Sequence, residues 1–207
     1  RRPLSAMRFA VPQTVVLDGM DAHVSGVFAR TLSALSAAGA QIIEIPLTEL
    51  AEIPKINSPG GLSPIEGYAE HHARLARAQE QFDHRVAQRM MLGATVTAQQ
   101  YINLLDARRD WIKRVEHAVE GYDALLSPTI PVVAPVIADL LASDEAFFKA
   151  NGLLLRNTFT INVLDGCSFS LPCHATGELP VGLMVSSVNG DDARLAAVAL
   201  AIESALK

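Results

Sequence analysis

The sequence predicts an α/β fold: a mixed, mainly parallel sheet with helices on both faces. The first 46 residues show a strand, an amphipathic helix and a strand in turn, which is a βαβ unit and implies parallel pairing. Near the other end, two apolar runs flank a short connection containing Gly177, a pattern typical of an antiparallel pair. Half of the 207 residues are hydrophobic, which is enough for a packed core. The length suits one domain over residues 1–207.

The opening βαβ unit has recognisable boundaries. Arg8–Pro12 is a short apolar strand that ends at a proline, and Asp21 is a typical helix N-cap. Gln41–Pro46 is rich in β-branched residues and predicts the second strand. The intervening helix should end at Ala38-Gly39, and its apolar residues recur at helical spacing: Val24, Val27, Phe28, Leu32 and Leu35.

The middle of the chain predicts helices. Residues 47–62 are loop-like because they contain two prolines and a Gly-Gly pair, and a helix should follow from Pro64. Thr97 and Gln100 have the spacing of a capping box. They predict a long helix that ends near Gly121 and turns its apolar residues inward: Tyr101, Leu104, Leu105, Trp111, Ile112, Val115 and Val119.

The last third completes the alternation of strands and helices. A buried strand begins at Ala124 and runs into a proline-rich loop, and a helix is expected from Asp144 to about Arg156. Ser168–Cys173 and Val181–Ser187 are the expected antiparallel strands. Asp191 should then cap a final helix with an apolar face: Leu195, Val198, Ala199, Ile202 and Leu206.

Charge and composition exclude several classes of function. The net charge of −5 and the absence of a basic stripe argue against nucleic acid as a partner. No apolar run approaches the roughly 20 residues needed to cross a bilayer, so no membrane association is expected. The two cysteines form neither a disulfide framework nor a metal-binding pair. We therefore expect a soluble protein of the cytoplasm.

Two local patterns contain residue types found in catalytic or metal sites. Gly166–Ser170 (Gly-Cys-Ser-Phe-Ser) resembles a nucleophile elbow, but its last residue is not glycine and Ser168 enters a strand rather than a helix. Glu66, Glu70 and the adjacent pair His71-His72 are potential metal ligands. Neighbouring histidines on a helix project about 100° apart, so a polar helix flank is the favoured interpretation. No catalytic residue, metal or cofactor is predicted.

Further residues favour structural roles. Cys167 and Cys173 lie in apolar strand regions and are expected to pack in the core. Acidic and basic residues alternate on the long helix, which is typical of a solvated face rather than an anion site. The basic residues there are Arg108, Arg109, Lys113 and Arg114, with Asp110 among them.

Three segments in order resemble the amidase signature family. They are Tyr122–Pro131 (Tyr-Asp-Ala-Leu-Leu-Ser-Pro-Thr-Ile-Pro), Asn157–Gly166 with its Asn-Thr-x-x-x-Asn pattern, and Ser170–Cys173 followed by Leu179–Val185. The resemblance covers nearly the whole chain and implies a partial amidase-signature fold. The family cleaves carboxylic amide C–N bonds with a serine nucleophile, a second serine in a cis peptide bond and a lysine base. It implies a small-molecule amide substrate for the full-length enzyme.

The catalytic part of that resemblance is missing. Gly60-Gly61 is followed by Leu-Ser-Pro rather than by a serine pair, and none of the four lysines has a matching context. The chain starts at Arg1, which matches the point just after the catalytic half. We therefore expect a C-terminal segment that is inactive alone and either forms a homo-oligomer or associates with the N-terminal half. The alternative is a catalytically dead amidase-like binding or assembly module.

Two residues are candidates for substrate binding by resemblance. Related amidotransferase subunits hold substrate with a tyrosine and an arginine, and Tyr68 and Arg89 are the positions that resemble them. A tyrosine at such a position is more often an ordinary aromatic residue on the helix surface.

Overall fold

The computed structural model describes residues 2–58 and 60–207. The chain divides into two compact units. Unit 1 comprises Arg1–Ala51 and Arg114–Lys207, and unit 2 comprises Glu52–Lys113. Whether residues 1–207 fold as one domain stays a prediction.

Unit 1 is built on a five-stranded sheet with the order β2-β1-β3-β5-β4. The central strand β1 pairs in parallel with β2 and with β3, whereas β5 is antiparallel to both β3 and β4. Four strands therefore point the same way, and the predicted mixed, mainly parallel sheet is confirmed. The strands are β1 Arg8–Pro12, β2 Gln41–Ile45, β3 Ala124–Pro128, β4 Cys167–Pro172 and β5 Gly182–Ser187.

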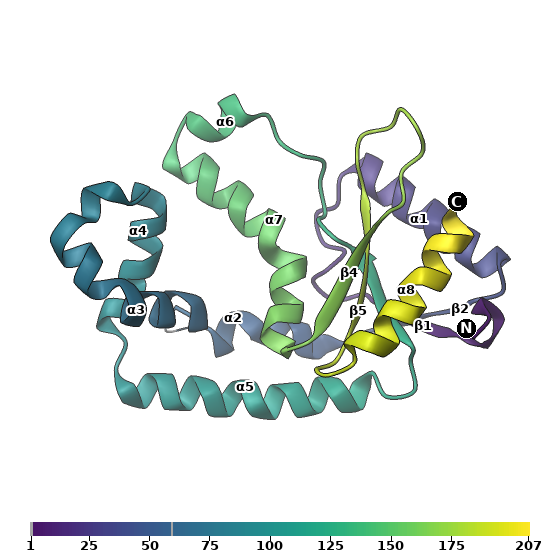
Figure 1. Cartoon of the computed structure of the whole chain (residues 1–207), viewed down its shortest axis with the longest axis horizontal. Coiled ribbons are helices and arrows are strands. Elements are labelled where there is room, and N and C mark those ends of the chain that lie inside the picture. The colour runs from purple at the N-terminus through teal and green to yellow at the C-terminus, as the bar shows by residue number, and fades with distance from the viewer. Residues whose placement is uncertain (1, 59) are drawn as a thin grey trace. The chain divides into compact units, whose positions relative to one another are not determined.

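Helices lie on both faces of this sheet (Figure 1). Helices α1 (Ala22–Ala37) and α8 (Asp192–Leu206) pack on one face, and α7 (Asp144–Leu164) lies on the other with the short α6 (Ile137–Leu141) against it. Burial of apolar side chains between the sheet and the helix pair α1 and α8 is the main source of stability. Its fully buried members include Phe9, Val11, Leu35, Leu126, Leu183, Val185, Leu195 and Ile202.

The two predicted caps behave differently. Asp21 caps α1 by accepting from the Val24 amide at 2.7 Å, and its second oxygen accepts from the Val133 amide at 2.7 Å. Asp21 thus also holds the proline-rich loop after β3. Asp191 occupies the N-cap position of α8, but its carboxylate caps nothing. It instead accepts hydrogen bonds from Ser187 and Arg194.

Two expectations about local structure need correction. The segment 47–62 is not simply a loop, because it contains the 3₁₀ helix Thr48–Glu52 and the short helix α2 (Ile53–Ile56). Helix α7 does not end near Arg156 but continues for two further turns to Leu164. It ends where Asp165 adopts a left-handed conformation, with φ of 61°.

Unit 2 is helical. Helix α3 (Leu62–Ala78) packs against α4 (His84–Met91) around a small core of Leu75, Ala87 and Met90. Short 3₁₀ segments follow α3 and α4 at Gln79–Gln81 and Leu92–Thr95. Gly93 is required there, because a Cβ at this position would lie 2.8 Å from the Cα of Ile65.

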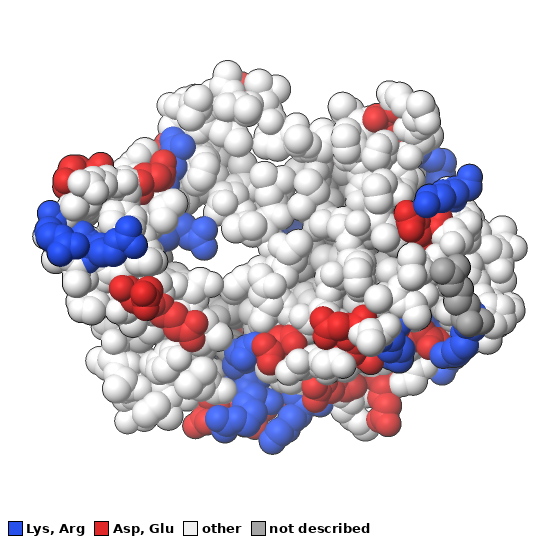
Figure 2. All heavy atoms as spheres, in the orientation of Figure 1, with Lys and Arg blue, Asp and Glu red and all other residues white. Residues whose placement is uncertain are grey.

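Helix α5 (Ala98–Ala118) begins in unit 2 and continues into unit 1. The Thr97–Gln100 capping box is confirmed: the Thr97 hydroxyl accepts from the Gln100 amide at 3.2 Å, and the Gln100 side chain accepts from the Thr97 amide at 2.9 Å. Both signs of charge alternate over α5 (Figure 2). Arg109 pairs with Asp106 at 2.9 Å on this exposed surface, which supports the solvated-face interpretation.

Among the described residues, every helix is too short or too polar to span a membrane.

Candidate functional site

The topology of unit 1 points to the gap between β1 and β3 as a binding site. From β1 the chain moves to β2 on one side, and it later returns to β3 on the other side. In open α/β sheets, ligands bind outside the carboxyl ends of the strands where the strand order reverses in this way. We call the carboxyl ends of β1 and β3, with the part of α7 that contacts them, the switch-point site.

Asn157 of α7 joins the two sides of the switch-point site. Its side chain is fully buried, and its amide nitrogen donates to the carbonyl oxygens of Val16 at 2.9 Å and Pro128 at 2.8 Å. One carbonyl belongs to the loop after β1 and the other to the end of β3. A buried polar group persists only when it is hydrogen-bonded, so Asn157 fixes the spacing of these two segments.

Arg156 lies beside Asn157 and is partly buried. Its Nε donates to the Asn157 side-chain oxygen at 3.1 Å, and its Nη2 donates to the Val16 carbonyl at 3.3 Å. Burial lowers the pKa of the Arg156 guanidinium, an effect that the exposed carboxylate of Asp18 opposes. The switch-point site therefore holds a positive charge that is partly removed from water.

The loop after β1 is strained at Val15. This residue has φ of 69°, and the Val16 amide donates to the Thr14 carbonyl at 2.8 Å across it. A hydrogen bond between residues two apart, around a central residue with positive φ, defines the rare and strained form of the γ-turn. A β-branched residue in that region costs on the order of 1–3 kcal/mol and persists only where its surroundings hold it. Asn157 and Arg156 supply that restraint through the Val16 carbonyl.

A pair of hydroxyls lies along the same edge. Thr129 follows β3, and its Oγ1 lies 2.6 Å from the Oγ of Ser170 on β4. Gly182 permits this pair, because a Cβ there would lie 2.7 Å from the Thr129 Oγ1. These groups donate and accept hydrogen bonds, but nothing in the pair removes a proton from either hydroxyl.

The structure supports the strand interpretation of Ser168 and the core interpretation of the cysteines. Ser168 lies within β4, and within the described ranges its hydroxyl contacts the Ser186 hydroxyl, at 2.9 Å, rather than a base. Cys167 and Cys173 are unpaired and partly buried against the main core. Burial raises the pKa of both thiols, which makes them poor nucleophiles.

The resemblance candidates Tyr68 and Arg89 lie in unit 2, on facing helices. Tyr68 on α3 packs against the small core of that unit, and Arg89 is exposed in the last turn of α4. A Cβ at Gly67 would lie 3.4 Å from Met90 Cγ, so the two helices are in close contact at this level. Neither candidate lines the nearby cavity of ≈ 420 Å³ in unit 2. Their role in substrate binding stays a prediction.

The acidic and histidine residues of α3 form no metal-like cluster in the described part of the chain. Glu66 accepts from the Tyr101 hydroxyl at 3.1 Å, and this hydrogen bond raises the pKa of Tyr101. His72 contacts the Ala69 carbonyl at 2.8 Å, and His71 stacks near Phe82 at 6.2 Å between ring centroids. These contacts fit a polar helix flank.

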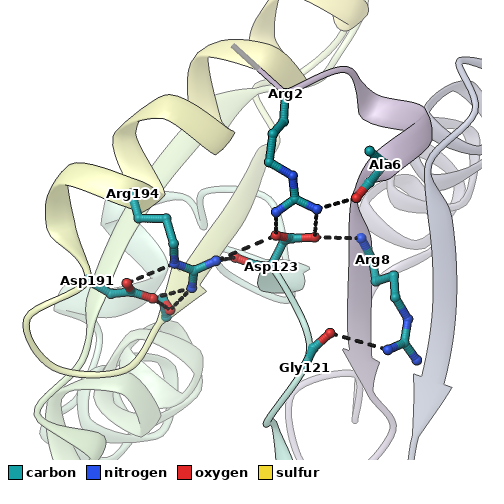
Figure 3. A network of polar contacts seen from close by, with 8 residues as sticks. Arg2, Ala6, Arg8, Gly121, Asp123, Asp191 and Arg194 are labelled. Atoms are coloured by element: carbon teal, nitrogen blue, oxygen red, sulfur yellow. Dashed lines mark hydrogen bonds and ion pairs between the residues drawn. The ribbon is translucent and has the colours of Figure 1, made fainter.

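A polar network at the opposite end of the sheet is structural (Figure 3). Asp123 accepts from the Arg8 amide at 2.8 Å and from the Arg2 guanidinium. Arg194 donates to the Asp123 carbonyl at 3.0 Å and pairs with Asp191. A cavity of ≈ 250 Å³ adjoins the network, but the Arg194 guanidinium on its wall is already occupied by protein acceptors. The network holds the N-terminal segment, β3 and α8 together.

Sequence reasoning singled out the Asn157-Thr158 motif but assigned no role to Asn157 or Arg156. The sequence held no local signal for Asn157, because the helix predicted from Asp144 was expected to end at about Arg156, just before it.

The chain is similar to known proteins over nearly its whole length. A family model described as Amidase matches residues 1–196. The 2-amino-5-chloromuconic acid deaminase of Comamonas testosteroni is 27% identical over 204 residues, which cover 97% of this chain and 44% of the deaminase. A component of the glutamyl-tRNA(Gln) amidotransferase of Thermoanaerobacter pseudethanolicus is 25% identical over 229 residues, which cover 100% of this chain and 46% of that component.

Solved structures agree with this. An amidase crystal structure aligns with a TM-score of 0.79 at 25% identity, covering 97% of this chain and 46% of that one. An allophanate hydrolase of Kluyveromyces lactis aligns over 98% of this chain and 32% of its own, with a TM-score of 0.84 at 18% identity, which is evidence of fold alone. The chain spans less than half the length of these relatives.

Proposed function

The chain belongs to the Amidase family, whose model matches residues 1–196, and from this we propose that it supplies the C-terminal part of an enzyme that hydrolyses carboxylic amide C–N bonds. The substrate is a small-molecule amide. The observation that carries the proposal is the family match over a chain spanning less than half the length of its relatives.

In this proposal the nucleophile and its base lie on a complementary segment. A serine hydroxyl attacks an amide only after a base removes its proton. The hydroxyls of Thr129 and Ser170, along the same edge as the switch-point site, contact each other instead. The Ser168 hydroxyl, toward the other end of β4, contacts Ser186. The 207-residue chain is therefore expected to bind and position substrate but not to cleave it.

Tyr68 and Arg89 are proposed to contact the substrate. Arg89 is exposed at the end of α4 and carries a permanent charge. The tyrosine ring is fixed by the core of unit 2, and it lies 5.9 Å from the ring of His72. In the enzyme assembled with its complementary segment, Arg89→Gln should raise KM at least tenfold while kcat changes little. Arg109→Gln, on the solvated face of α5, is the matched control.

The edge strand β4 is proposed to pair with the complementary segment. The other edge strand, β2, carries Glu44 and Gln41, whereas β4 has no charged residue and leaves Phe169 38% exposed. An uncharged edge with free backbone groups is a template for pairing with another strand. Relatives more than twice as long as this chain contain enough polypeptide to cover it.

Without that segment, we expect β4 to drive self-association. Light scattering on the purified chain should give a mass above 22.1 kDa, and Phe169→Lys should shift the mass toward the monomer. Gln41→Lys on β2 is the control and should leave the mass unchanged. A wild-type chain that is monomeric at all concentrations would contradict the edge proposal.

The catalytic proposal is tested by the reading frame upstream of Arg1. The contiguous product should carry a Ser-Ser-Lys set and release ammonia from amides, while the 207-residue chain alone stays at background. Turnover by the 207-residue chain that disappears in Ser168→Ala would refute the division of labour. Binding of amides without turnover by the contiguous product would favour the alternative, a catalytically dead binding module.

The proposed location is the cytoplasm. A reducing cytoplasm suits the two free thiols.

A further inference from the structure

The Arg156 guanidinium is a partly buried charge whose nearby carboxylate, the exposed Asp18, acts on it without forming an ion pair. Other arginines of unit 1 do form ion pairs: Arg2 with Asp123, Arg30 with Glu178 at 2.7 Å, and Arg194 with Asp191. Within the described ranges, no carboxylate lies within ion-pair distance of Arg156. Removing a guanidinium from water costs free energy unless an anion or hydrogen-bond acceptors compensate for it.

The hydrogen bonds of Arg156 orient its guanidinium and leave donors free. A guanidinium has five N–H groups. In the described part of the chain, one is used by the Asn157 oxygen and one by the Val16 carbonyl. The other three have no acceptor among the described residues. Because Asn157 is itself fixed between two strand ends, the planar fork of donors is held in one orientation before any ligand arrives.

The fork of donors on Arg156 occupies a position that the sheet topology singles out. It lies at the switch point between β1 and β3, where the strand topology alone predicts ligand binding. The backbone strain at Val15 occurs in the same loop and is held by the same carbonyl that accepts from Arg156. Strain of this kind concentrates at ligand-binding sites.

We propose that Arg156 binds the carboxylate of the substrate, so that the substrate class is an amide that also carries a carboxylate. This rests on the proposed amidase function. A carboxylate accepts two parallel N–H bonds from a guanidinium, and this geometry is specific as well as strong. The ligand's charge would compensate for the burial of the guanidinium, which lowers the pKa of Arg156.

Binding is measured without turnover, by NMR on the ¹⁵N-labelled 207-residue chain. The Arg156 Nε–H signal and the amides of Val16 and Asn157 are followed during titration with succinamate, which has an amide and a carboxylate. Succinamide has the same length without the charge, and acetate has the charge without the amide. We expect saturable shifts with succinamate, at least tenfold weaker binding of succinamide and weaker binding of acetate.

Variants separate recognition from structure. Arg156→Lys keeps the charge but loses the fork, and it should weaken succinamate binding at least tenfold while far-UV circular dichroism stays unchanged. Arg156→Gln should abolish the preference for succinamate over succinamide. Arg30→Gln, an exposed arginine of the same unit, should change neither.

Three results would overturn the inference. Equal affinity for succinamate and succinamide would show that the carboxylate is not recognised. Acetate binding as tightly as succinamate would indicate a general anion site, and saturable succinamate binding that survives Arg156→Gln would place the site elsewhere. Failure of the contiguous product to hydrolyse any amide would refute the proposed function, and it would leave these binding results as an independent measurement.

Discussion

Replacing Asn157 with alanine should destabilise unit 1 by about 3 kcal/mol. The substitution removes two hydrogen bonds, to the Val16 and Pro128 carbonyls at 2.9 and 2.8 Å, from a fully buried site. A hydrogen bond contributes about 0.5–1.5 kcal/mol net, and leaving a buried partner unsatisfied costs roughly 1–3 kcal/mol more. The Val16 carbonyl keeps the longer bond from Arg156 at 3.3 Å, so the main unsatisfied group is the Pro128 carbonyl.

Urea unfolding followed by far-UV circular dichroism measures this effect. With a slope of about 2 kcal/mol/M, a loss of 3 kcal/mol lowers the urea midpoint by roughly 1.5 M. Asn189→Ala is the control: that side chain is exposed, it donates to Asp165 at 3.0 Å, and its loss should change stability by less than about 0.5 kcal/mol. If Asn157→Ala and Asn189→Ala unfold at the same urea concentration, the buried amide does not join the two strand ends as described.

Two further predictions concern glycine sites and pH. Gly166→Ala should destabilise the chain by more than about 1 kcal/mol, because its Cβ would overlap the Ser187 carbonyl oxygen. Gly152→Ala on α7 meets nothing within 4 Å and should stabilise by up to about 1 kcal/mol; thermal unfolding compares the pair, and equal melting temperatures would contradict this. The Arg194 hydrogen bond, opposed by burial, lowers the pKa of Asp191. The resulting stability is present above the ordinary aspartate pKa and is lost as pH falls through the lowered one. Asp191→Asn should therefore lower the free energy of unfolding at pH 7 and make that free energy fall less steeply in acid. The same pH dependence of stability in the variant and the wild type would refute this prediction.

The elements with local signals could be predicted from sequence. Asp21 and the Thr97–Gln100 pair mark the starts of helices, because each cap involves only residues close in sequence. Both caps form as expected. Helix α7 continues past its predicted end near Arg156, although Asn157, Thr158 and Thr160 are poor helix formers. Tertiary contacts override that preference: Asn157 donates to carbonyls 29 and 141 residues away, and Thr160 donates to the Arg156 carbonyl one turn earlier at 3.0 Å.

The switch-point site could not be predicted for the same reason. Its two segments are separated by more than 100 residues, and only the strand order brings the carbonyls of Val16 and Pro128 to one asparagine. The prediction for Asp191 fails in the opposite way. Its position before α8 is that of an N-cap, but its carboxylate does not cap the helix. In the folded chain Arg194 donates a charged hydrogen bond to the Asp191 carboxylate. Because both of its groups are ionised, this bond competes successfully with bonds from the neutral backbone amides of the helix.

The chemistry of the switch-point site fits the proposed division of labour with a complementary segment. A group that positions substrate works best when it is rigid and its charge is constant, and the guanidinium of Arg156 meets both conditions through Asn157 and Val16. A nucleophile needs a base that changes its protonation state during the reaction. Rigid hydrogen bonds to backbone carbonyls cannot supply that change. If this chain provides the fixed anion-binding group, the segment that completes the enzyme must bring the proton-accepting one.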